Sequence, residues 1–587
     1  MTEIEAKQFL RESADSAGAG RWDESIALAR RAIECCPDFG EGYDRLGQSL
    51  RASGQLREAI DAYRAGIDAQ PGCVANYCHL AEALIQNGQV LEAMAAGKQA
   101  LRLDGNSADA WYILGIAHVV QNDLEEAVRS FKKVTELRPG FVEAFNNLGN
   151  ALKLTGETAK AIDAYRAGLT RDPRGSIVHS NLIFLMLFLE QYDAEAILAE
   201  MMRWNAFHAE PFYKSILPHE NDRTPDRRLR VGYVSSDLCH HILLRNILPL
   251  FREHDHGQFE TFCYSNVARP DQFTNRCKGL MDHWRNIRGL DDDRAARMIR
   301  EDRIDILVDL AGHMGETRLM IFARKPAPVQ VTFGGYPGGT GLTTMDFRLS
   351  DPYLDPPGMN ESHYVERIVR LPHSWWCYLM DEMDVTSPIR PTPSASRDGV
   401  VFGCLSSSIK ISDHSLNVWK RLLAQMPESR LVLLEPPRAQ RDKILRALGE
   451  GRERIRFVAS RPRAAYLELY HEIDIFLDSL PYNGHTTALD ALVMGVPVVT
   501  RPGATAVGRA GVSILTNLGL TELIGKDDEA YISIAKRLAG DIPRLNDLRM
   551  GMRARMQASP LMDARRFARD IEAAYRQMWS EWCARVT

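Results

Sequence analysis

The first third of the chain repeats one helical pattern of apolar and polar residues every 34 positions. A residue that stops a helix closes each unit, at Pro37, Pro71, Gly105, Pro139 and Pro173. Midway through each unit lies a residue that tolerates a left-handed turn between two helices, at Gly20, Gly54, Gly88, Asn122 and Gly156. The pattern therefore predicts five helix pairs over residues 6–175.

Small residues recur at the same period where the two helices of a pair should cross. One series is Gly47, Ala81, Gly115 and Gly149, and the other is Ser25, Ala59, Ala93, Ala127 and Ala161. This is the tetratricopeptide pattern, which builds an α superhelix whose surfaces hold other proteins. Residues 176–209 keep helical apolar spacing without the punctuation. We therefore expect a degenerate sixth repeat and a repeat domain over residues 1–209.

The apolar pattern changes from helical to strand-like at Leu229, after a polar connector at 218–228. Apolar runs predict strands at 229–236, 259–265, 304–312 and 328–338, with a helix at 291–302. A Pro- and Ser-rich linker at 386–399 separates a second set of predicted strands, at 400–405, 430–435, 454–459, 473–478 and 497–500.

Strands that alternate with helices predict two doubly wound α/β lobes, at 229–385 and 399–587. The second lobe should end in a long amphipathic helix at 563–582. In such sheets, ligands bind at the carboxyl ends of the strands, so a cleft between the lobes is the expected site.

Composition narrows the function. The formal net charge of -5 argues against a nucleic-acid binder that relies on bulk charge. No apolar run of about 18 residues predicts a membrane helix, and the polar N-terminus does not resemble a secretory signal. Ten scattered cysteines without a CxxC pair are typical of reduced thiols. We expect a cytoplasmic protein without nucleic-acid or membrane partners.

The strongest local motif is PYNGHTTALDALVMGVPVVT at 481–500. A predicted strand ends at Asp478 and a helix begins near Thr486, where two hydroxyls and free backbone amides would form an anion site. The alternative is that Thr486 or Thr487 only caps the helix, with Asp490 closing a capping box. Spacing alone slightly favours that alternative.

Two further candidates follow the first strand of each lobe. His240 and His241 end the SSDLCHH segment, where a histidine could accept a hydroxyl proton or simply cap a helix. Lys410 could neutralise a phosphate or be a solvated surface residue. The glycines at 309–319 and 334–341 match neither the dinucleotide fingerprint nor the P-loop.

The acidic run Asp291–Asp293 is better explained as a helix cap than as a metal site. No other group of side chains has the spacing of metal ligands, so we expect no metal.

Several long motifs together resemble the protein O-linked N-acetylglucosamine transferases, in particular the bacterial type. They are RVGYVSSD (230–237) with His241, DILVDLAGH (305–313), RKPAPVQVTFGGYPGGTG (324–341), LPHSWW (371–376), Lys410 and PYNGHTTALDALVMGVP (481–497). The resemblance covers nearly the whole chain. It implies a GT-B fold, a UDP-sugar as donor substrate, and transfer to Ser or Thr hydroxyls with inversion and without metal or cofactor.

The resemblance also implies roles for single residues. His241 matches the cleft histidine, Asp237 an aspartate four residues before it, and Lys410 the lysine on the donor diphosphate. His485, Thr486 and Thr487 match the phosphate-binding segment, and Asp490 matches the carboxylate on the ribose. Arg318 matches an arginine beside the donor, and Tyr466 stands where a histidine commonly stacks on the base.

Three departures from the family pattern bear on sugar and acceptor. Gly334 and Gly335 replace bulkier residues and would open the sugar pocket. Ser406, Ser407 and Ser408 replace an amide side chain before the lysine. The inner surface of the repeats carries Asp44, Cys78, Tyr112 and Asn146 where the animal enzymes have an asparagine ladder.

The sequence leaves three hypotheses. The first is transfer of N-acetylglucosamine from UDP-GlcNAc to a protein held by the repeats. The second is transfer of another sugar, to a dedicated substrate such as flagellin or as an O-fucosyltransferase. The third is a non-enzymatic repeat scaffold. The identity of the acceptor and the formation of a homodimer stay open.

Overall fold

The computed structural model describes residues 3–380, 387–396 and 398–585, and it divides into two compact units after Gly175. Residues 381–385 of the predicted lobe 229–385, the predicted linker residues 386 and 397, and the first two and last two residues of the chain lie outside the described ranges. We describe each unit by itself.

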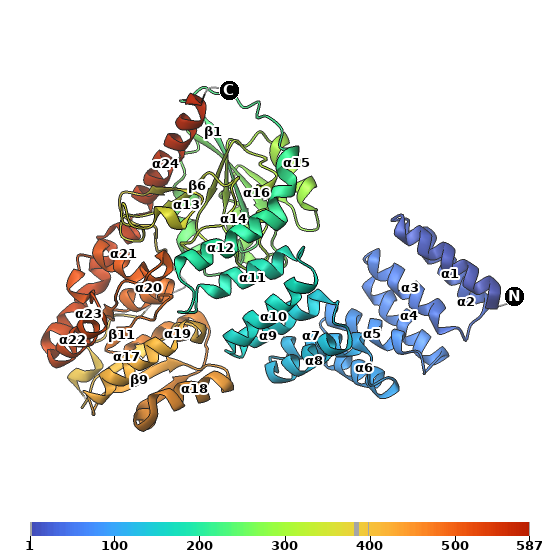
Figure 1. Ribbon diagram of the computed structural model, residues 1–587, viewed down its shortest axis with the longest axis horizontal. Helices are drawn as coiled ribbons and strands as arrows, with labels where there is room; N and C mark the ends of the chain where they lie inside the picture. Colours follow the sequence, from blue (N-terminus) through green and yellow to red (C-terminus); the bar gives the residue numbers. More distant parts are fainter. Residues whose placement is uncertain (1–2, 381–386, 397, 586–587) are drawn as a thin grey trace. The chain divides into compact units, whose positions relative to one another are not determined.

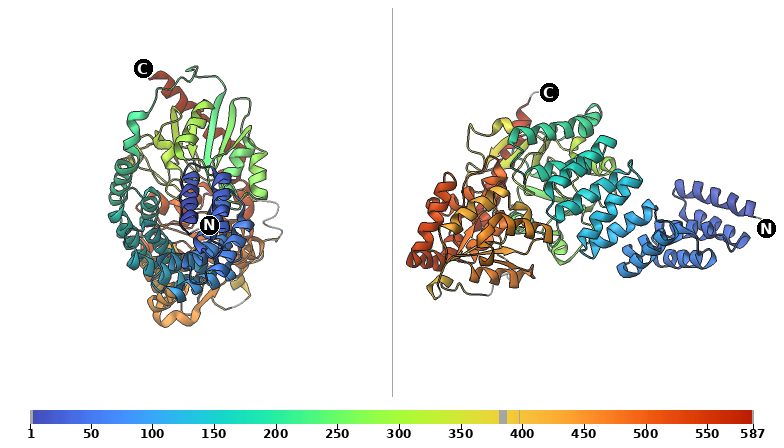
Figure 2. Two further views of the ribbon diagram at one scale, coloured as in Figure 1. Left: turned by 90° about the vertical axis from the view of Figure 1, so that its right-hand side faces the viewer. Right: turned by 60° about the horizontal axis from the view of Figure 1, so that its bottom comes forward.

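The first unit contains the five predicted helix pairs, seen as stacked hairpins in Figures 1 and 2. The pairs are α1 (Glu3–Gly18) with α2 (Trp22–Cys35), α3 (Gly40–Ala52) with α4 (Leu56–Ala69), α5 (Val74–Gln86) with α6 (Val90–Leu103), α7 (Ala108–Val120) with α8 (Leu124–Leu137), and α9 (Val142–Leu154) with α10 (Thr158–Arg171). The turn residues have the predicted left-handed backbone, with φ of 74° at Gly20 and 58° at Asn122. The predicted superhelix of repeats is thus confirmed.

The small residues lie where the helices cross. A Cβ atom on Gly149 would lie 2.4 Å from the Tyr165 ring, and one on Gly115 would lie 2.6 Å from the Phe131 ring. The second series is fully buried, with Ala59, Ala93, Ala127 and Ala161 all at 0% exposure. Each aromatic ring therefore fills the space that the glycine opposite leaves free.

A sixth helix pair, α11 (Ser176–Met186) and α12 (Ala194–Trp204), belongs to the second unit. Ser180 on α11 is hydrogen-bonded to His313 of the first lobe at 3.0 Å. A π-helical turn (Asn205–Ala209) and a 3-10 turn (Glu210–Ser215) follow α12. The segment predicted as a degenerate repeat is thus a helix pair that packs on the lobes. The boundary at residue 209 stays a prediction.

The first lobe has a seven-stranded sheet in the order β3-β2-β1-β4-β5-β6-β7, with every neighbouring pair parallel. Its strands are β1 (Leu229–Ser235), β2 (Phe259–Ser265), β3 (His283–Asn286), β4 (Ile306–Asp309), β5 (Val329–Thr332), β6 (Phe347–Ser350) and β7 (Arg367–Arg370). Its helices are α13 (Leu244–Glu253), α14 (Gln272–Lys278), α15 (Asp292–Glu301) and α16 (Leu319–Ala323). The apolar-run pattern did not predict β3, β6 or β7.

The second lobe has a parallel five-stranded sheet in the order β10-β9-β8-β11-β12. Its strands are β8 (Val401–Cys404), β9 (Arg430–Leu434), β10 (Ile455–Val458), β11 (Ile475–Leu477) and β12 (Val498–Val499). Its helices are α17 (Asp413–Ala424), α18 (Arg438–Leu448), α19 (Arg463–Glu468), α20 (His485–Val493), α21 (Ala510–Asn517), α22 (Asp528–Gly540), α23 (Ile542–Gln557) and α24 (Ala564–Ala584). The predicted pair of doubly wound lobes is confirmed.

Both sheets reverse their strand order at one point, between β1 and β4 in the first lobe and between β8 and β11 in the second. At such a point the connections leave the strand ends in opposite directions, and a crevice opens beside their carboxyl ends. The predicted functional segments follow β1, β8 and β11. The topology therefore places them at the two crevices.

The last helix, α24, crosses back from the second lobe to the first, where Figure 1 shows it beside α13. Its Glu572 accepts a hydrogen bond from the backbone of Asp255 at 2.8 Å and contacts His254 at 3.0 Å. Further along, the Trp579 indole donates to the Thr224 carbonyl at 3.2 Å. The chain thus passes between the lobes twice, once after β7 and once through α24.

Candidate active site

Lys410 lies in the crevice of the second sheet, on the turn that follows β8. Its ammonium donates a hydrogen bond to the Asn483 carbonyl at 2.7 Å and lies 4.2 Å from the centre of the Tyr482 ring. Burial lowers the pKa of Lys410 to about 8, although the nearby Asp478 carboxylate opposes that shift. The side chain is thus held in place, and the alternative of a freely solvated lysine is wrong.

The amino end of α20 faces the same crevice. The helix begins at His485, and the residue before it, Gly484, has no side chain to cap it. The Thr487 hydroxyl shares a hydrogen bond with the Ser406 hydroxyl at 2.8 Å and also donates to the Gly484 carbonyl. The alternative that Thr486 or Thr487 only caps the helix is therefore wrong, because the cap position is Gly484. Asp490 closes no capping box, since its carboxylate is bonded to Arg463 and Tyr378.

Asp478 holds the turn that leads into α20. Its carboxylate accepts hydrogen bonds from the backbone of Gly484 at 2.7 Å and of Ser479 at 3.0 Å, and from the Thr500 hydroxyl at 2.7 Å. Burial raises the pKa of Asp478 to about 6. Asp478 was predicted only as the end of a strand, although a carboxylate at the carboxyl end of a buried strand is also typical of a site residue.

His485 anchors the same turn from its far side. Its Nε2 contacts the Val507 carbonyl at 2.9 Å, and its ring stacks on Tyr482 with centroids 4.7 Å apart. Burial lowers the pKa of His485 well below its usual value, and the charge of Lys410 adds to this effect. The imidazole is therefore neutral, and as its Nε2 faces a carbonyl oxygen it donates there.

Asp490, predicted to hold the ribose, is paired within the protein. Both of its oxygens accept hydrogen bonds from the Arg463 guanidinium, each at 2.6 Å, and the Tyr378 hydroxyl donates to one of them at 2.6 Å. Tyr378 comes from the segment that follows β7, and Arg463 begins α19. Neither Tyr378 nor Arg463 was predicted as a partner, since no local signal in the sequence links them to Asp490.

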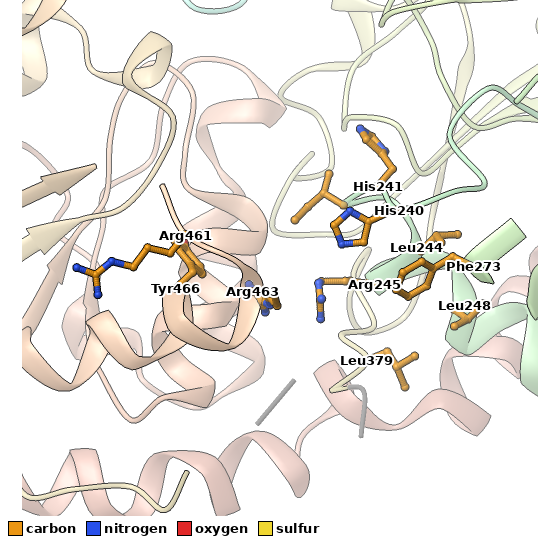
Figure 3. Close-up of a pocket in the computed structure, with 11 residues that line it drawn as sticks. His240, His241, Leu244, Arg245, Leu248, Phe273, Leu379, Arg461, Arg463 and Tyr466 are labelled. Carbon is orange, nitrogen blue, oxygen red and sulfur yellow. The ribbon is translucent and has the colours of Figure 1, made fainter. Parts of the chain in front are cut away.

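A cavity of about 240 Å³ lies between the two lobes. Figure 3 shows His240, His241 and Arg245 of the first lobe opposite Arg463 and Tyr466 of the second. The guanidinium of Arg461 also lines it, and its apolar and aromatic side chains are Ile242, Leu244, Leu248, Phe273 and Leu379. A negatively charged ligand with a flat aromatic part fits this chemistry.

His241 is exposed at the first-lobe wall of this cavity. Its Nδ1 accepts a hydrogen bond from the Leu243 backbone N–H at 3.3 Å. A neutral imidazole whose Nδ1 accepts must carry its proton on Nε2, so Nε2 is a donor. Asp237, four residues earlier, is half-buried and donates its backbone N–H to the Ser235 hydroxyl at 3.0 Å.

Arg318 and Gly335 take structural positions in the first lobe. The Arg318 guanidinium bonds to Asp292 at 2.8 Å, to Asn266 at 3.0 Å and to the Leu290 carbonyl at 3.0 Å. A Cβ atom on Gly335 would lie 2.8 Å from the Ala311 carbonyl oxygen, so close backbone packing requires glycine there. Neither residue lines the cavity, and their donor-binding roles stay predictions.

The acidic run Asp291–Asp293 opens α15, as predicted. Asp291 caps the helix by accepting the Arg294 backbone N–H at 2.7 Å, and Asp293 pairs with Arg324 at 2.5 Å. Within the described ranges, no group of three or more His, Cys, Asp or Glu side chains could hold a metal ion. Nor does any helix of this part of the chain combine the length and apolar character needed to cross a bilayer.

Comparison with known proteins finds a glycosyltransferase family model and a tetratricopeptide repeat model that match this chain. The family model described as glycosyl transferase family 41 matches residues 200–387 and 382–571, and the tetratricopeptide repeat model matches 45–108, 98–140 and 112–176. A structure of a mutant of the Thermobaculum terrenum O-GlcNAc transferase superposes with a TM-score of 0.79 at 34% identity, covering 87% of this chain and 98% of that one.

Curated plant proteins are also similar. The Oryza sativa subsp. japonica protein named probable UDP-N-acetylglucosamine–peptide N-acetylglucosaminyltransferase SPINDLY is 36% identical over 434 residues, which is 72% of this chain and 46% of that one. The Arabidopsis thaliana protein of the same enzyme description, named SEC, is 31% identical over 370 residues, 61% of this chain and 38% of that one. The chain spans less than half the length of these relatives. On the family match and the shared fold, the chain belongs to glycosyl transferase family 41.

Proposed function

We propose that the protein is an inverting protein O-glycosyltransferase that transfers a sugar from a nucleotide diphosphate donor to a Ser or Thr hydroxyl. The repeat unit would hold the acceptor protein, and the cleft between the lobes would hold the donor. The single observation that carries this proposal is the crevice of the second sheet, where Lys410 and the amino end of α20 meet beside Asn483.

That crevice is suited to a leaving diphosphate. When the bond to the sugar breaks, negative charge grows on the phosphate oxygens, and donors already in place stabilise it. The ammonium of Lys410 and the first backbone N–H groups of α20 would supply this stabilisation, helped by the dipole of the helix. Asp478 and His485 would keep the turn rigid, so that these donors do not have to reorganise during the reaction.

The first-lobe wall would position the acceptor hydroxyl. In the tautomer that the Leu243 contact favours, His241 Nε2 donates a hydrogen bond toward the cleft. His241 would then orient the acceptor oxygen or a phosphate oxygen, and it would become a base only after the Leu243 contact breaks. Asp237 and the donor phosphate are the other candidate proton acceptors.

The donor we propose first is UDP-N-acetylglucosamine, because the similar plant and bacterial proteins are named for transfer of that sugar. Tyr466 lines the cavity on the second-lobe side and offers a ring to a nucleobase. Asp490 would reach a ribose by sharing its carboxylate with Arg463.

Testing this proposal requires measurements of nucleotide binding and of sugar transfer. Thermal unfolding of the whole chain would be compared with UDP, GDP and CMP, followed by hydrolysis and transfer assays with UDP-GlcNAc and GDP-fucose on Ser- and Thr-containing peptides. A nucleotide at 100 times its dissociation constant should add about 2.7 kcal/mol of stability.

UDP stabilisation together with transfer from UDP-GlcNAc supports the full proposal. Stabilisation and transfer with GDP-fucose would keep the reaction class and replace the donor. Absence of any nucleotide effect would contradict the enzyme and favour a repeat scaffold.

A further inference from the structure

An aromatic column connects the sixth helix pair to the candidate diphosphate site. We use this name for six side chains in contact order: Tyr336, Phe184, Phe188, Tyr482, His485 and Trp376. Tyr336 belongs to the first lobe, Phe184 and Phe188 belong to α11 and the turn after it, and Tyr482 and His485 belong to the segment that enters α20. The column therefore joins three parts of the second unit.

The contacts along the column are continuous. Ring centroids lie 5.5 Å apart between Tyr336 and Phe184, 5.2 Å between Phe184 and Phe188, and 5.3 Å between His485 and Trp376. The Phe188 and Tyr482 rings are nearly parallel, with an interplanar angle of 4° and centroids 4.5 Å apart. Both of these rings are only 5% exposed.

Tyr482 is the point where the column meets Lys410. The Lys410 ammonium lies 4.2 Å from the centre of the Tyr482 ring and bonds to the carbonyl of the next residue, Asn483. A cation over an aromatic face is attracted to that face, so the place of the ring helps to set the place of the ammonium. A ring fixed by a flat stacking partner leaves the ammonium fewer alternative positions.

We infer that Phe188 is a positioning residue for Lys410 and acts through Tyr482. The helix pair α11–α12 would then contribute a positioning residue to the donor site, in addition to continuing the array of helix pairs. The inference rests on the proposed function in one respect, since that function assigns the diphosphate to Lys410.

The surroundings of Lys410 make its position measurable. The titratable groups that influence it are the Asp478 carboxylate and the Cys404 thiol, and the Lys410 charge in turn affects His485. Phe188 cannot titrate. A change in the reactivity of the Lys410 amine on altering Phe188 therefore reports a change in the position or the exposure of the amine.

The experiment compares the whole chain with Phe188→Leu, Phe188→Met and Phe188→Tyr. The first two keep most of the volume and lose the flat stack, whereas tyrosine keeps the ring. Phe212→Leu is the matched control. Phe212 is a half-buried ring in the 3-10 turn that follows α12, and the Arg324 guanidinium of the first lobe covers its face at 4.0 Å.

Two quantities are measured for each protein. The first is the pH dependence of acetylation of the Lys410 amine by limiting acetic anhydride, quantified by mass spectrometry. The second is the dissociation constant of inorganic pyrophosphate. For Phe188→Leu and Phe188→Met we expect the apparent pKa of Lys410 to rise by about one unit, which lowers labelling at neutral pH about ten-fold. Pyrophosphate affinity should fall by a similar factor.

Phe188→Tyr and Phe212→Leu should each keep the apparent pKa of Lys410 and the pyrophosphate dissociation constant at the values of the unaltered chain. Unchanged labelling and unchanged affinity in folded Phe188→Leu or Phe188→Met would overturn the inference. If the chain turns over a donor but the labelling of Lys410 does not change when Phe188 is altered, the inference is contradicted and the proposed function is kept. If the labelling of Lys410 changes but the chain turns over no donor, the inference is kept and the proposed function is contradicted.

Discussion

The Lys410 ammonium and the Asn483 backbone oxygen are 2.7 Å apart, and this contact joins the turn after β8 to the turn before α20. The two turns follow adjacent strands at the point where the strand order of the sheet reverses. A cation fixed there lies beside the amino end of a helix, where an anionic group is stabilised from both sides.

Replacing Lys410 with alanine should remove most of this stabilisation. We expect kcat/KM for the sugar donor to fall at least about 100-fold, the usual cost of losing one oriented donor to a developing charge. Lys420→Ala is the matched control, because Lys420 is an exposed lysine on α17 in the same lobe. Steady-state donor hydrolysis would measure both variants, and equal losses would exclude a specific role for Lys410.

The pH dependence of kcat/KM should have two limbs. The Lys410 ammonium, with a pKa of about 8, loses its charge as the pH rises through that value. The Asp478 carboxylate, with a pKa of about 6, loses its charge as the pH falls through that value, and with it the full set of hydrogen bonds that holds the turn. Activity should therefore be highest between about pH 6 and pH 8.

Lys410→Arg tests the assignment of the alkaline limb. A guanidinium keeps its charge far above pH 8, so the residual activity of this variant should not decline there. A limb near pH 8 that persists in Lys410→Arg would assign that titration to another group.

Arg463→Ala should destabilise the second lobe. The change leaves the Asp490 carboxylate, only 1% exposed, without its two-pronged ion pair. Removing one partner of a buried pair costs about 3 kcal/mol or more. Urea unfolding followed by tryptophan fluorescence would show a lower midpoint.

Arg461→Ala is the control for that change, because Arg461 lines the same cavity as an exposed side chain and should shift the midpoint little. Adding Asp490→Asn to Arg463→Ala should cost less than the sum of the two single changes, as expected for residues in contact. Additive losses would show that the two groups do not interact in solution.

Gly149→Ala should loosen the last complete repeat. The new Cβ atom would lie 2.4 Å from the Tyr165 ring, and overpacking of this kind costs about 1–3 kcal/mol. Hydrogen–deuterium exchange in the whole chain should speed up in α9 and α10. Gly72→Ala introduces the same atom into open space and should leave exchange unchanged. Equal protection in both variants would argue against close packing of the ring.

The sequence predicted the repeats and most strands because their signals are local. A turn residue or a crossing glycine is required by its own backbone, and a strand buried on both faces reads as an apolar run. The missed strand β6 contains Arg348, which interrupts such a run. The structure buries this arginine at 1% exposure by pairing it with Asp355 at 2.6 Å.

The residues of the candidate site that directly follow strands could be predicted from the sequence, because the carboxyl ends of parallel strands meet at one edge of the sheet. Lys410 and Thr487 follow strands that turned out to be neighbours, so their proximity could be expected from topology. Arg463 reaches Asp490 from 27 residues away through the placement of α19, and Phe188 reaches Tyr482 from outside both lobes. Such contacts depend on how whole elements pack, and hydrophobic periodicity carries no information about that.

The double passage of the chain between the lobes has a mechanical consequence. Two bodies tethered at one point can swivel freely, whereas two bodies tethered at two points keep mainly a rotation about the line that joins the tethers. With one tether after β7 and the other in α24, the motion that the two connections themselves allow most readily is a rotation about the line between them, which would widen or narrow the cleft. A donor could enter and a spent nucleotide could leave by this motion while Lys410 and the amino end of α20, both in the second lobe, keep their mutual geometry.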